Sequence, residues 1–235
     1  MLTLRLLLAA RDGCDDALVA RLAGEARRAA AMLGAGGRAL VLARIAPDPF
    51  AAQYAAPRAF EAVLAVDAPP GAGADALADV ARGADARLGD LVQPDLCGAV
   101  VAERRRIVGG EGPMRFVYLM RHKAGSTTAA FQAHWGGPHA EFGRRTEGIA
   151  GYDQLHVDPQ AARAAARVAG FGVHRIDGIP ELHLRSAEEF VRAAVGSETG
   201  ALAIEDEKGF VDARNSVGFV CRVVGAPVAS EGGAR

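Results

Sequence analysis

The sequence predicts an α+β fold in which two ferredoxin-like β-α-β-β-α-β units follow one another and pair as an internal dimer. Segments of strand and helix character come in the same order in both halves of the 235-residue chain. Alignment of the halves places Leu8 on Met120, 112 positions later, and Gly98 on Gly218, 120 positions later. A sheet with helices on one face only needs a partner for its other face, so we expect the two units to pack sheet against sheet.

The first unit comprises residues 1–110 and ends in a Gly109-Gly110 linker. Apolar runs predict its strands, alanine- and leucine-rich stretches predict its helices, and glycine and proline mark the connections, including the one around Pro47, Pro49 and Pro57. In order, we expect a strand at 2–10, a helix at 15–33, strands at 38–45 and 60–66, a helix at 74–91 and a strand at 97–105.

The second unit, residues 111–226, repeats this order, and residues 227–235 are predicted to form a flexible tail. The eight additional residues in its alignment fit an inserted loop at 158–170 with a short alanine-rich helical turn. We expect a strand at 115–121, a helix at 127–145 broken at Gly136-Gly137-Pro138, strands at 151–157 and 173–184, a helix at 186–195 and a strand at 217–224.

Charge and cysteine content exclude several functional classes. Lys+Arg 27 against Asp+Glu 28 give a formal net charge of −1, and neither half is basic, so no nucleic-acid or membrane partner is expected. The three cysteines are widely spaced, which argues against a disulfide framework and fits a reducing compartment. Residues 1–10 are interpreted as a strand rather than a signal peptide, and no apolar run is long enough to span a membrane. We therefore expect a cytoplasmic protein.

The segment from Phe131 to His139 is the main candidate for a functional site. Phe131, Trp135 and His139 recur every fourth residue, so on a helix they share one face. His139 follows the predicted helix break, where an imidazole can point into a cavity and act as a general acid or base near neutral pH. The alternative is that the aromatic rings are core residues and His139 only caps a helix. All six histidines lie in the second half, so we expect the first unit to be a degenerate, structural copy.

Further candidates lie on two predicted strands. One face of the strand at 151–157 carries Tyr152, Gln154 and His156. One face of the strand at 173–184 carries Asp177, Glu181 and His183. These side chains are candidates for hydrogen bonds to a polar ligand end or for orienting an imidazole, although each is also compatible with an ordinary core, edge or surface position.

No metal site is predicted. His134 and His139 are five residues apart, roughly 140° around a helix, so they do not form the i,i+4 pair of a zinc protease. Asp206, Glu207 and Asp212 are assigned to a solvated turn. The chain also lacks a glycine-rich phosphate loop after a strand and a Gly-x-Ser-x-Gly nucleophile elbow.

Ordered motifs of the second half resemble the EthD family of the dimeric α/β-barrel superfamily. The resemblance covers roughly residues 114–224, whereas the first half matches only in element order and apolar pattern. The motifs are Phe131, Trp135 and His139-Ala140; Tyr152-Asp153-Gln154-Leu155-His156; Asp177-Gly178-Ile179-Pro180-Glu181-Leu182; Glu188-Glu189-Phe190; and Asp206-Glu207-Lys208-Gly209-Phe210-Val211-Asp212. The resemblance implies an intramolecular dimeric α/β-barrel with a ligand cleft between sheet and helices. EthD-like proteins are associated with oxidative ether degradation, and the wider superfamily includes cofactor-independent oxygenases, isomerases, cyclases, dehydratases and haem-using enzymes.

The resulting hypothesis is a cofactor-independent EthD-like enzyme that acts on an aromatic, polyketide-like or otherwise apolar organic substrate, whereas a visible absorption band from the purified protein would instead indicate haem. His139 is assigned as the acid or base of a proton transfer that accompanies oxidation. The residues assigned to substrate binding are Phe131, Trp135, Tyr152, Gln154, His156, Asp177 and Glu181. The alternatives are an isomerase, cyclase or dehydratase that uses the same pocket, or a non-catalytic ligand-binding accessory protein. Association of two whole chains into a further homodimer stays open.

Overall fold

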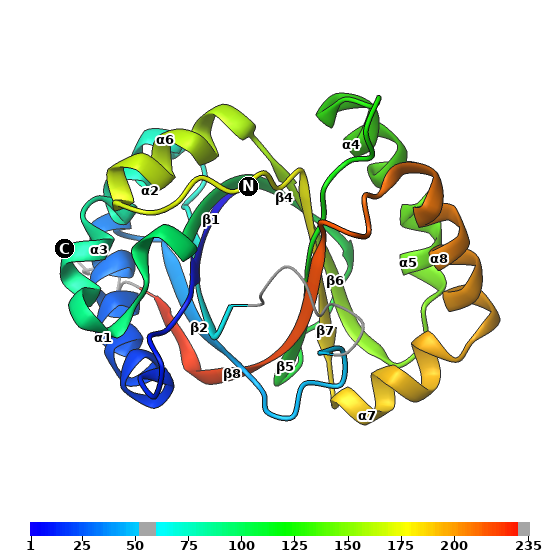
Figure 1. The fold of residues 1–235 in the computed structure, drawn as a ribbon, viewed down its shortest axis with the longest axis horizontal. Coiled ribbons are helices and arrows are strands. Elements are labelled where there is room, and N and C mark those ends of the chain that lie inside the picture. Colours follow the sequence, from blue (N-terminus) through cyan, green and yellow to red (C-terminus); the bar gives the residue numbers. More distant parts are fainter. Residues whose placement is uncertain (52–59, 230–235) are drawn as a thin grey trace.

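The computed structural model describes residues 1–51 and 60–229, within which eight antiparallel strands close into one barrel (Figure 1). The strands are β1 (Leu2–Leu8), β2 (Arg38–Arg44), β3 (Ala62–Asp67), β4 (Gly98–Val108), β5 (Met114–Leu119), β6 (Ile149–Val157), β7 (Gly178–Leu184) and β8 (Val217–Ala229). Around the barrel they follow the order β1-β3-β2-β8-β5-β7-β6-β4. This architecture confirms the predicted α+β class and the internal barrel.

The two halves have the same strand order. In each, the fourth strand pairs with the first, the first with the third, and the third with the second. Pairing of β2 with β8 and of β4 with β6 then joins the halves edge to edge. The sheets therefore close on one another instead of stacking as two open layers, and closure gives every edge strand a hydrogen-bonding partner.

The helices form two groups on opposite sides of the barrel (Figure 1). One group contains α1 (Asp15–Leu33), α2 (Ala74–Ala81), α3 (Ala84–Leu88) and α6 (Pro159–Ala169), with the 3₁₀ turns η1 (Gly89–Leu91) and η2 (Pro94–Leu96) nearby. The other contains α4 (Thr128–Gly136), α5 (Ala140–Arg145), α7 (Ala187–Phe190), the π-helical η3 (Val191–Val195) and α8 (Glu198–Phe210). Among the described residues, no helix combines the length and apolar character needed to cross a membrane.

The segment predicted as an inserted loop is the three-turn helix α6. The Asp158 side chain accepts hydrogen bonds from the backbone N–H of Gln160 (2.8 Å) and Ala161 (3.0 Å), and Pro159 occupies the first turn. Gly170 ends the helix in the left-handed conformation. Buried alanines on one face pack on β4 and α2, so this insertion of the second half covers the first half's side of the barrel.

Several other elements differ from the predicted ones in their boundaries, and the single helix predicted at 74–91 is divided into α2, α3 and η1. Of the acidic residues assigned to a turn, Asp206 and Glu207 belong instead to α8, because Ser197 caps that helix and it continues to Phe210, whereas Asp212 lies beyond its end. Strand β7 begins at Gly178 rather than at 173. Strand β8 extends to Ala229 and so includes the first residues of the predicted tail, whereas residues 230–235 and Pro57 lie outside the described residues.

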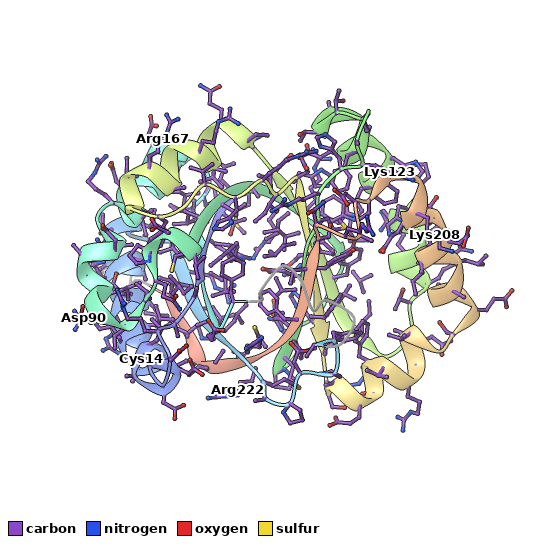
Figure 2. The ribbon with its side chains drawn as sticks, viewed as in Figure 1. Cys14, Asp90, Lys123, Arg167, Lys208 and Arg222 are labelled. Atoms are coloured by element: carbon purple, nitrogen blue, oxygen red, sulfur yellow. The ribbon has the colours of Figure 1, made fainter. Side chains whose placement is uncertain are left out.

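Side chains fill the barrel interior and the layers beneath the helices (Figure 2). On β5, Val117 and Leu119 belong to the larger core, whereas Phe116 and Tyr118 belong to a separate cluster under the second-half helices. In the first half, a stripe of leucine and alanine on α1 is fully buried. In the second half, by contrast, the helices leave a cavity against the sheet.

Candidate active site

A cavity of about 370 Å³, here called the helix-side cavity, lies between the outer barrel face at β5 and β7 and the helices α7 and α8. The rings of Phe50, Phe116 and Phe190 form one wall, with centroids 4.8 Å apart for Phe50 and Phe116 and 5.4 Å apart for Phe116 and Phe190. Leu182 and Val211 extend this apolar lining. The cavity has the size and character of a site for a small, largely apolar organic molecule.

Helix α8 supplies the opposite wall through residues spaced by one turn. Gly200, Ala203, Ile204, Glu207 and Val211 all line the cavity, and the three- and four-residue intervals between them place them on one helical face. This face is apolar except at Glu207. A carboxylate is therefore presented to an apolar cavity by a regular helix rather than by a mobile turn.

Glu207 has an unusual electrostatic environment. Burial, together with the neighbouring negative charge of Asp206, raises the pKa of the Glu207 carboxyl to about 7. At neutral pH this group consequently exchanges between protonated and ionised forms, which is the property required of a general acid or base.

His139 lies directly behind Glu207. Helix α4 ends at Gly136, α5 begins at Ala140, and His139 occupies the break between them, as its spacing from Trp135 predicted. The His139 side chain is only 9% exposed, and its Nε2 atom is 3.8 Å from the nearer carboxylate oxygen of Glu207. That distance is longer than a hydrogen bond, but a small side-chain movement would bring the two groups into contact.

Asp206 fixes the orientation of the His139 ring. Its Oδ2 atom is 2.8 Å from His139 Nδ1 and 3.0 Å from Nε2 of His134. An ionised carboxylate only accepts hydrogen bonds, so Nδ1 of His139 carries the proton, and in the neutral ring Nε2 is an acceptor facing Glu207. Burial lowers the pKa of His139, although the hydrogen bond to Asp206 opposes this shift. His139 is therefore held as a neutral, oriented imidazole at neutral pH.

Phe131 and Trp135 lie in the core beneath α4 and do not line the helix-side cavity. Their ring centroids are 5.7 Å apart, and both rings lie against the first residue of β7, Gly178. A Cβ atom at Gly178 would lie 2.5 Å from the Trp135 ring, so a glycine is needed there for this close approach. The aromatic pair anchors α4 to the sheet.

Tyr152, Gln154 and His156 share the outer face of β6, as predicted, but they form a buried network under α4. The Gln154 amide donates to the Trp135 carbonyl (3.0 Å) and to the Tyr152 hydroxyl (2.9 Å), and its oxygen contacts His156 Nε2 (3.0 Å). The His156 ring stacks on Trp135 at 4.8 Å, and burial lowers its pKa to about 4. None of the three lines the helix-side cavity.

Asp177 and Glu181 lie away from this cavity and from each other. Asp177 precedes β7 and accepts hydrogen bonds from the His122 backbone N–H (2.9 Å) and the Thr128 hydroxyl (2.5 Å), which ties the start of α4 to the sheet. Glu181 points into the barrel, where it pairs with Arg5 at 2.7 Å. The predicted site residues thus fall into separate places, and His139 is the one beside the helix-side cavity.

Glu207 is the residue that sequence reasoning missed. Its signal is the stripe of small and apolar residues at positions 200, 203, 204 and 211, which has helical spacing and contains one carboxylate. The surrounding acidic residues hid this pattern, because a run of charges is typical of a solvated segment. Ser197, a suitable N-cap, would have marked the helix start.

Solved structures with this fold include several oxidation-related proteins. An anthrone oxidase-like protein has a TM-score of 0.63 at 12% identity, covering 99% of this chain and 93% of its own. A candidate monooxygenase from Fusobacterium nucleatum subsp. nucleatum has a TM-score of 0.55 at 9% identity, with 95% and 92% coverage. A haem-binding protein from Thermus thermophilus has a TM-score of 0.50 at 14% identity, with 95% and 91% coverage. At these identities the likeness shows the fold alone, and among curated proteins none matches the sequence.

The helix-side cavity does not provide a typical haem site. Protein-bound haem iron usually takes a histidine, cysteine or methionine as axial ligand. The described residues that line the cavity include none of these three types, and both His139 nitrogens face carboxylates. Tyrosine serves as the axial ligand in some haem proteins, and Tyr118 is the one tyrosine among the described lining residues. Nor do the described residues form a cluster of three or more metal-ligating side chains. The residues present therefore fit an organic ligand better than a haem.

A family match identifies the part of the chain that carries this site. Residues 123–214 match the EthD domain, and the matched region contains α4, α5 and α8, and with them His139, Asp206 and Glu207. The resemblance inferred from the ordered motifs is thereby confirmed. The second half of this chain contains an EthD domain, set in a barrel of the dimeric α/β type.

Proposed function

We propose that this protein is an oxidoreductase that deprotonates an aromatic or polyketide-like substrate in the helix-side cavity, with Glu207 as the base. The observation that carries the proposal is the Glu207 carboxylate, with its pKa raised to about 7, on the wall of a largely apolar cavity that also has Tyr118, Thr146 and Lys208 on its lining, and next to an oriented imidazole. A base whose pKa is near the working pH is the most effective in proton transfer.

The cavity binds the substrate mainly through its apolar surface. Phe50, Phe116 and Phe190 offer ring faces and edges to a planar aromatic body. The hydroxyl-bearing side chains of Tyr118 and Thr146 lie on the same lining and supply polarity for a substrate oxygen. Such a combination orients a substrate with one polar end and one apolar end.

Proton transfer then follows a short path. The ionised Glu207 carboxylate removes a proton from an acidic C–H or O–H of the substrate. His139 Nε2, 3.8 Å away, accepts that proton from Glu207, and Asp206 stabilises the imidazolium that forms. His139 is thus a relay behind the base rather than the group that contacts the substrate, which changes the role that the sequence suggested for it.

Oxidation follows from the electron-rich anion that deprotonation leaves. For a tricyclic ketone of the anthrone type, CH₂ loses a proton to give an aromatic oxyanion, which transfers electrons to O₂. The balanced reaction converts CH₂ and O₂ into C=O and H₂O. The name of the anthrone oxidase-like structure and the EthD match support this choice of chemistry, which needs no bound redox group.

The test measures oxygen uptake by the purified protein with anthrone as probe. We expect wild-type protein to consume O₂ above the uncatalysed rate, and Glu207→Gln to lose about 10²- to 10⁴-fold in kcat/KM, the usual contribution of general acid–base catalysis. His139→Asn is expected to lower kcat more than it raises KM, because the relay does not contact substrate. Glu205→Gln, on the same helix and 70% exposed, is the matched control and should leave the rate unchanged.

Three results would contradict the proposal. Turnover of the probe without oxygen uptake would assign the site to an isomerase, cyclase or dehydratase. Binding of aromatic probes with no turnover in any variant would instead assign it to a ligand-binding protein. Equal rates for wild type and Glu207→Gln would remove Glu207 from the reaction while leaving the cavity as the site.

A further inference from the structure

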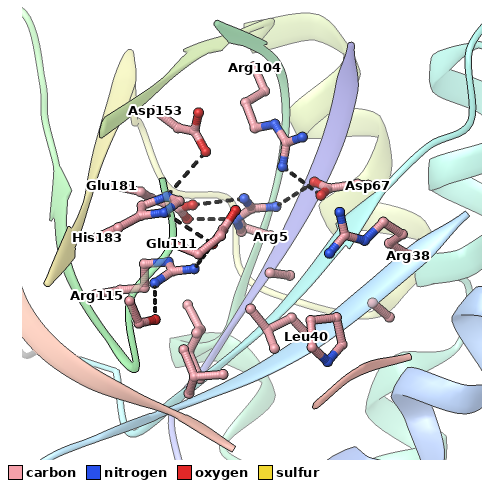
Figure 3. A pocket seen from close by; sticks show the side chains of 16 residues that line it. Arg5, Arg38, Leu40, Asp67, Arg104, Glu111, Arg115, Asp153, Glu181 and His183 are labelled. Atoms are coloured by element: carbon pink, nitrogen blue, oxygen red, sulfur yellow. Dashed lines mark hydrogen bonds and ion pairs between the residues drawn. The ribbon is translucent and has the colours of Figure 1, made fainter. Parts of the chain in front are cut away.

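A second cavity of about 330 Å³, here called the barrel cavity, lies inside the barrel and is separate from the helix-side cavity (Figure 3). Strands from both halves line it, including β1 with Arg5, β5 with Arg115 and β7 with Glu181 and His183. The two cavities have no lining residue in common. The mechanism proposed above therefore gives the barrel cavity no role.

The carboxylates that line the barrel cavity are already paired. Both oxygens of Glu181 accept from Arg5, at 2.7 and 2.9 Å, and Asp67 accepts from Arg104 at 2.6 Å. Asp153 accepts two hydrogen bonds from Arg106, at 2.8 and 2.9 Å. Little acceptor capacity remains on these groups for a cationic ligand.

The guanidinium groups of Arg115 and Arg38 are less completely paired with carboxylates than that of Arg5 is. The Arg115 side chain is 6% exposed, and its one carboxylate partner, Glu111 at 2.5 Å, is itself 59% exposed. Its other hydrogen bonds go to the carbonyls of Gly112 (2.7 Å) and Met114 (3.0 Å), through the same terminal nitrogen. Its Nε–H therefore remains available. The Arg38 guanidinium, at the start of β2, is on an exposed residue and has no hydrogen bond or ion pair within residues 1–51 and 60–229.

The buried and incompletely paired Arg115 guanidinium is expected to attract an anion. A desolvated cation with incomplete compensation favours any anion that can reach it, because the interaction is stronger in a cavity than in water. Burial lowers the pKa of Arg115, and the nearby Arg5 contributes to the same shift, so the environment disfavours this charge in the absence of an added anion. The Arg38 and Arg115 side chains lie on opposite sides of the cavity (Figure 3).

The remaining lining is apolar. Leu40, Leu42 and Ala65 from the first half, with Val223 from β8, form the wall beside Arg38. An apolar cavity of about 150 Å³ is large enough for benzene, so about 330 Å³ accommodates one or two fused rings and an acidic group. The cavity thus combines a cationic end with an apolar end.

We infer that the barrel cavity is a second ligand site, for a small organic carboxylate with an apolar body, held by Arg115 and Arg38. The carboxylate lies at the guanidinium groups, and the apolar body lies against Leu40, Leu42 and Val223. Arg5 stays paired with Glu181 and acts as a fixed part of the wall. The site does not depend on Glu207 and stands whether or not the oxidation proposed above is correct.

The test is calorimetric titration of the full chain with sodium benzoate, with benzyl alcohol as the uncharged analogue. We expect benzoate to bind and benzyl alcohol to bind at least about 10-fold more weakly, because a charge-assisted contact is lost. Arg38→Gln is expected to weaken benzoate binding at least about 10-fold with little effect on folding, since no partner is lost. Arg222→Gln, an exposed arginine on β8 that does not line the cavity, is the matched control and should bind as wild type does (Figure 2).

A further variant separates the two cavities. Ile204→Trp places a large ring in the helix-side cavity and should leave benzoate binding unchanged. The inference is overturned if wild-type protein does not bind benzoate at millimolar concentration, or if Arg38→Gln binds as wild type does. It is equally overturned if Ile204→Trp alone abolishes binding, because benzoate then occupies the helix-side cavity.

Discussion

Replacing Glu207 with glutamine is expected to stabilise the protein at pH 8 but much less at pH 5. The wild-type carboxyl has a pKa of about 7 in the folded protein against 4.5 for an ordinary glutamate. The folded state therefore keeps its proton between these values while the unfolded state loses it. Because the folded state binds more protons there, the free energy of unfolding falls as pH rises from about 4.5 to about 7 and is level above that. Glutamine does not titrate, so the Glu207→Gln variant does not show this fall in the free energy of unfolding.

The size of the effect follows from the two pKa values. Each pKa unit corresponds to about 1.36 kcal/mol, so the difference between 4.5 and about 7 amounts to about 3 kcal/mol at most. The Glu207 side chain is 28% exposed, and water reaching the carboxylate reduces the effect, so we expect about 2 kcal/mol between pH 5 and pH 8. An acidic residue that destabilises the fold at working pH is typical of a catalytic group.

Urea denaturation at pH 5 and pH 8 measures this difference for wild type and Glu207→Gln. The stabilisation by glutamine should grow by about 2 kcal/mol from the lower to the higher pH. Glu205→Gln, on the same helix and highly exposed, should show no such growth. If the stabilisation by Glu207→Gln is the same at both pH values, the carboxylate titrates normally and the argument for its role as the base is refuted.

Two further predictions concern close packing and buried charge. Gly143→Ala should destabilise the protein by about 1 to 3 kcal/mol in thermal denaturation, because its Cβ would lie 2.3 Å from the Tyr152 ring. Gly209→Ala meets nothing within 4 Å and should be neutral or stabilising, so equal effects of the two changes would contradict the packing described. Glu181→Gln should cost about 3 to 5 kcal/mol because it removes the carboxylate that Arg5 contacts at 2.7 Å and leaves only the longer pair with Asp67, at 3.7 Å. A double-mutant cycle with Arg5→Met should recover much of that loss, and additive costs would show that the pair does not interact.

Much of the fold could be predicted from the sequence, because the patterns that indicate strands, helices and their order involve residues close together in the chain. The order of strands and helices, the break before His139 and the shared face of Tyr152, Gln154 and His156 all follow from spacing along the chain. Two helices were not predicted. The insertion that became α6 has a buried stripe made of alanines, and the acidic segment that became part of α8 has a stripe of small and apolar residues among charged ones, so the composition obscured both helical patterns.

The assignment of site residues depended on information that spacing does not contain. Periodicity shows that Tyr152 and Gln154 share one face of β6 and that Glu181 and His183 share one face of β7, but not which face meets a cavity. In the barrel, the first pair lies under α4 and the second points inward. The register of β6 on β7 and the position of α4 decide this, and both involve residues far apart in the chain.

The sequence by itself determined most of the element order and the likeness of the second half to EthD proteins, because these depend on neighbours along the chain. Only the tertiary structure decided that Glu207, rather than His139, lines the helix-side cavity, and that a second cavity, lined by arginine and carboxylate side chains, lies within the barrel. The pKa of a carboxyl depends on the groups that surround it in space, and so does the pairing of a guanidinium charge with carboxylates and carbonyls. Asp206, His139 and the apolar walls come together only when α8 packs beside α5 and the barrel closes.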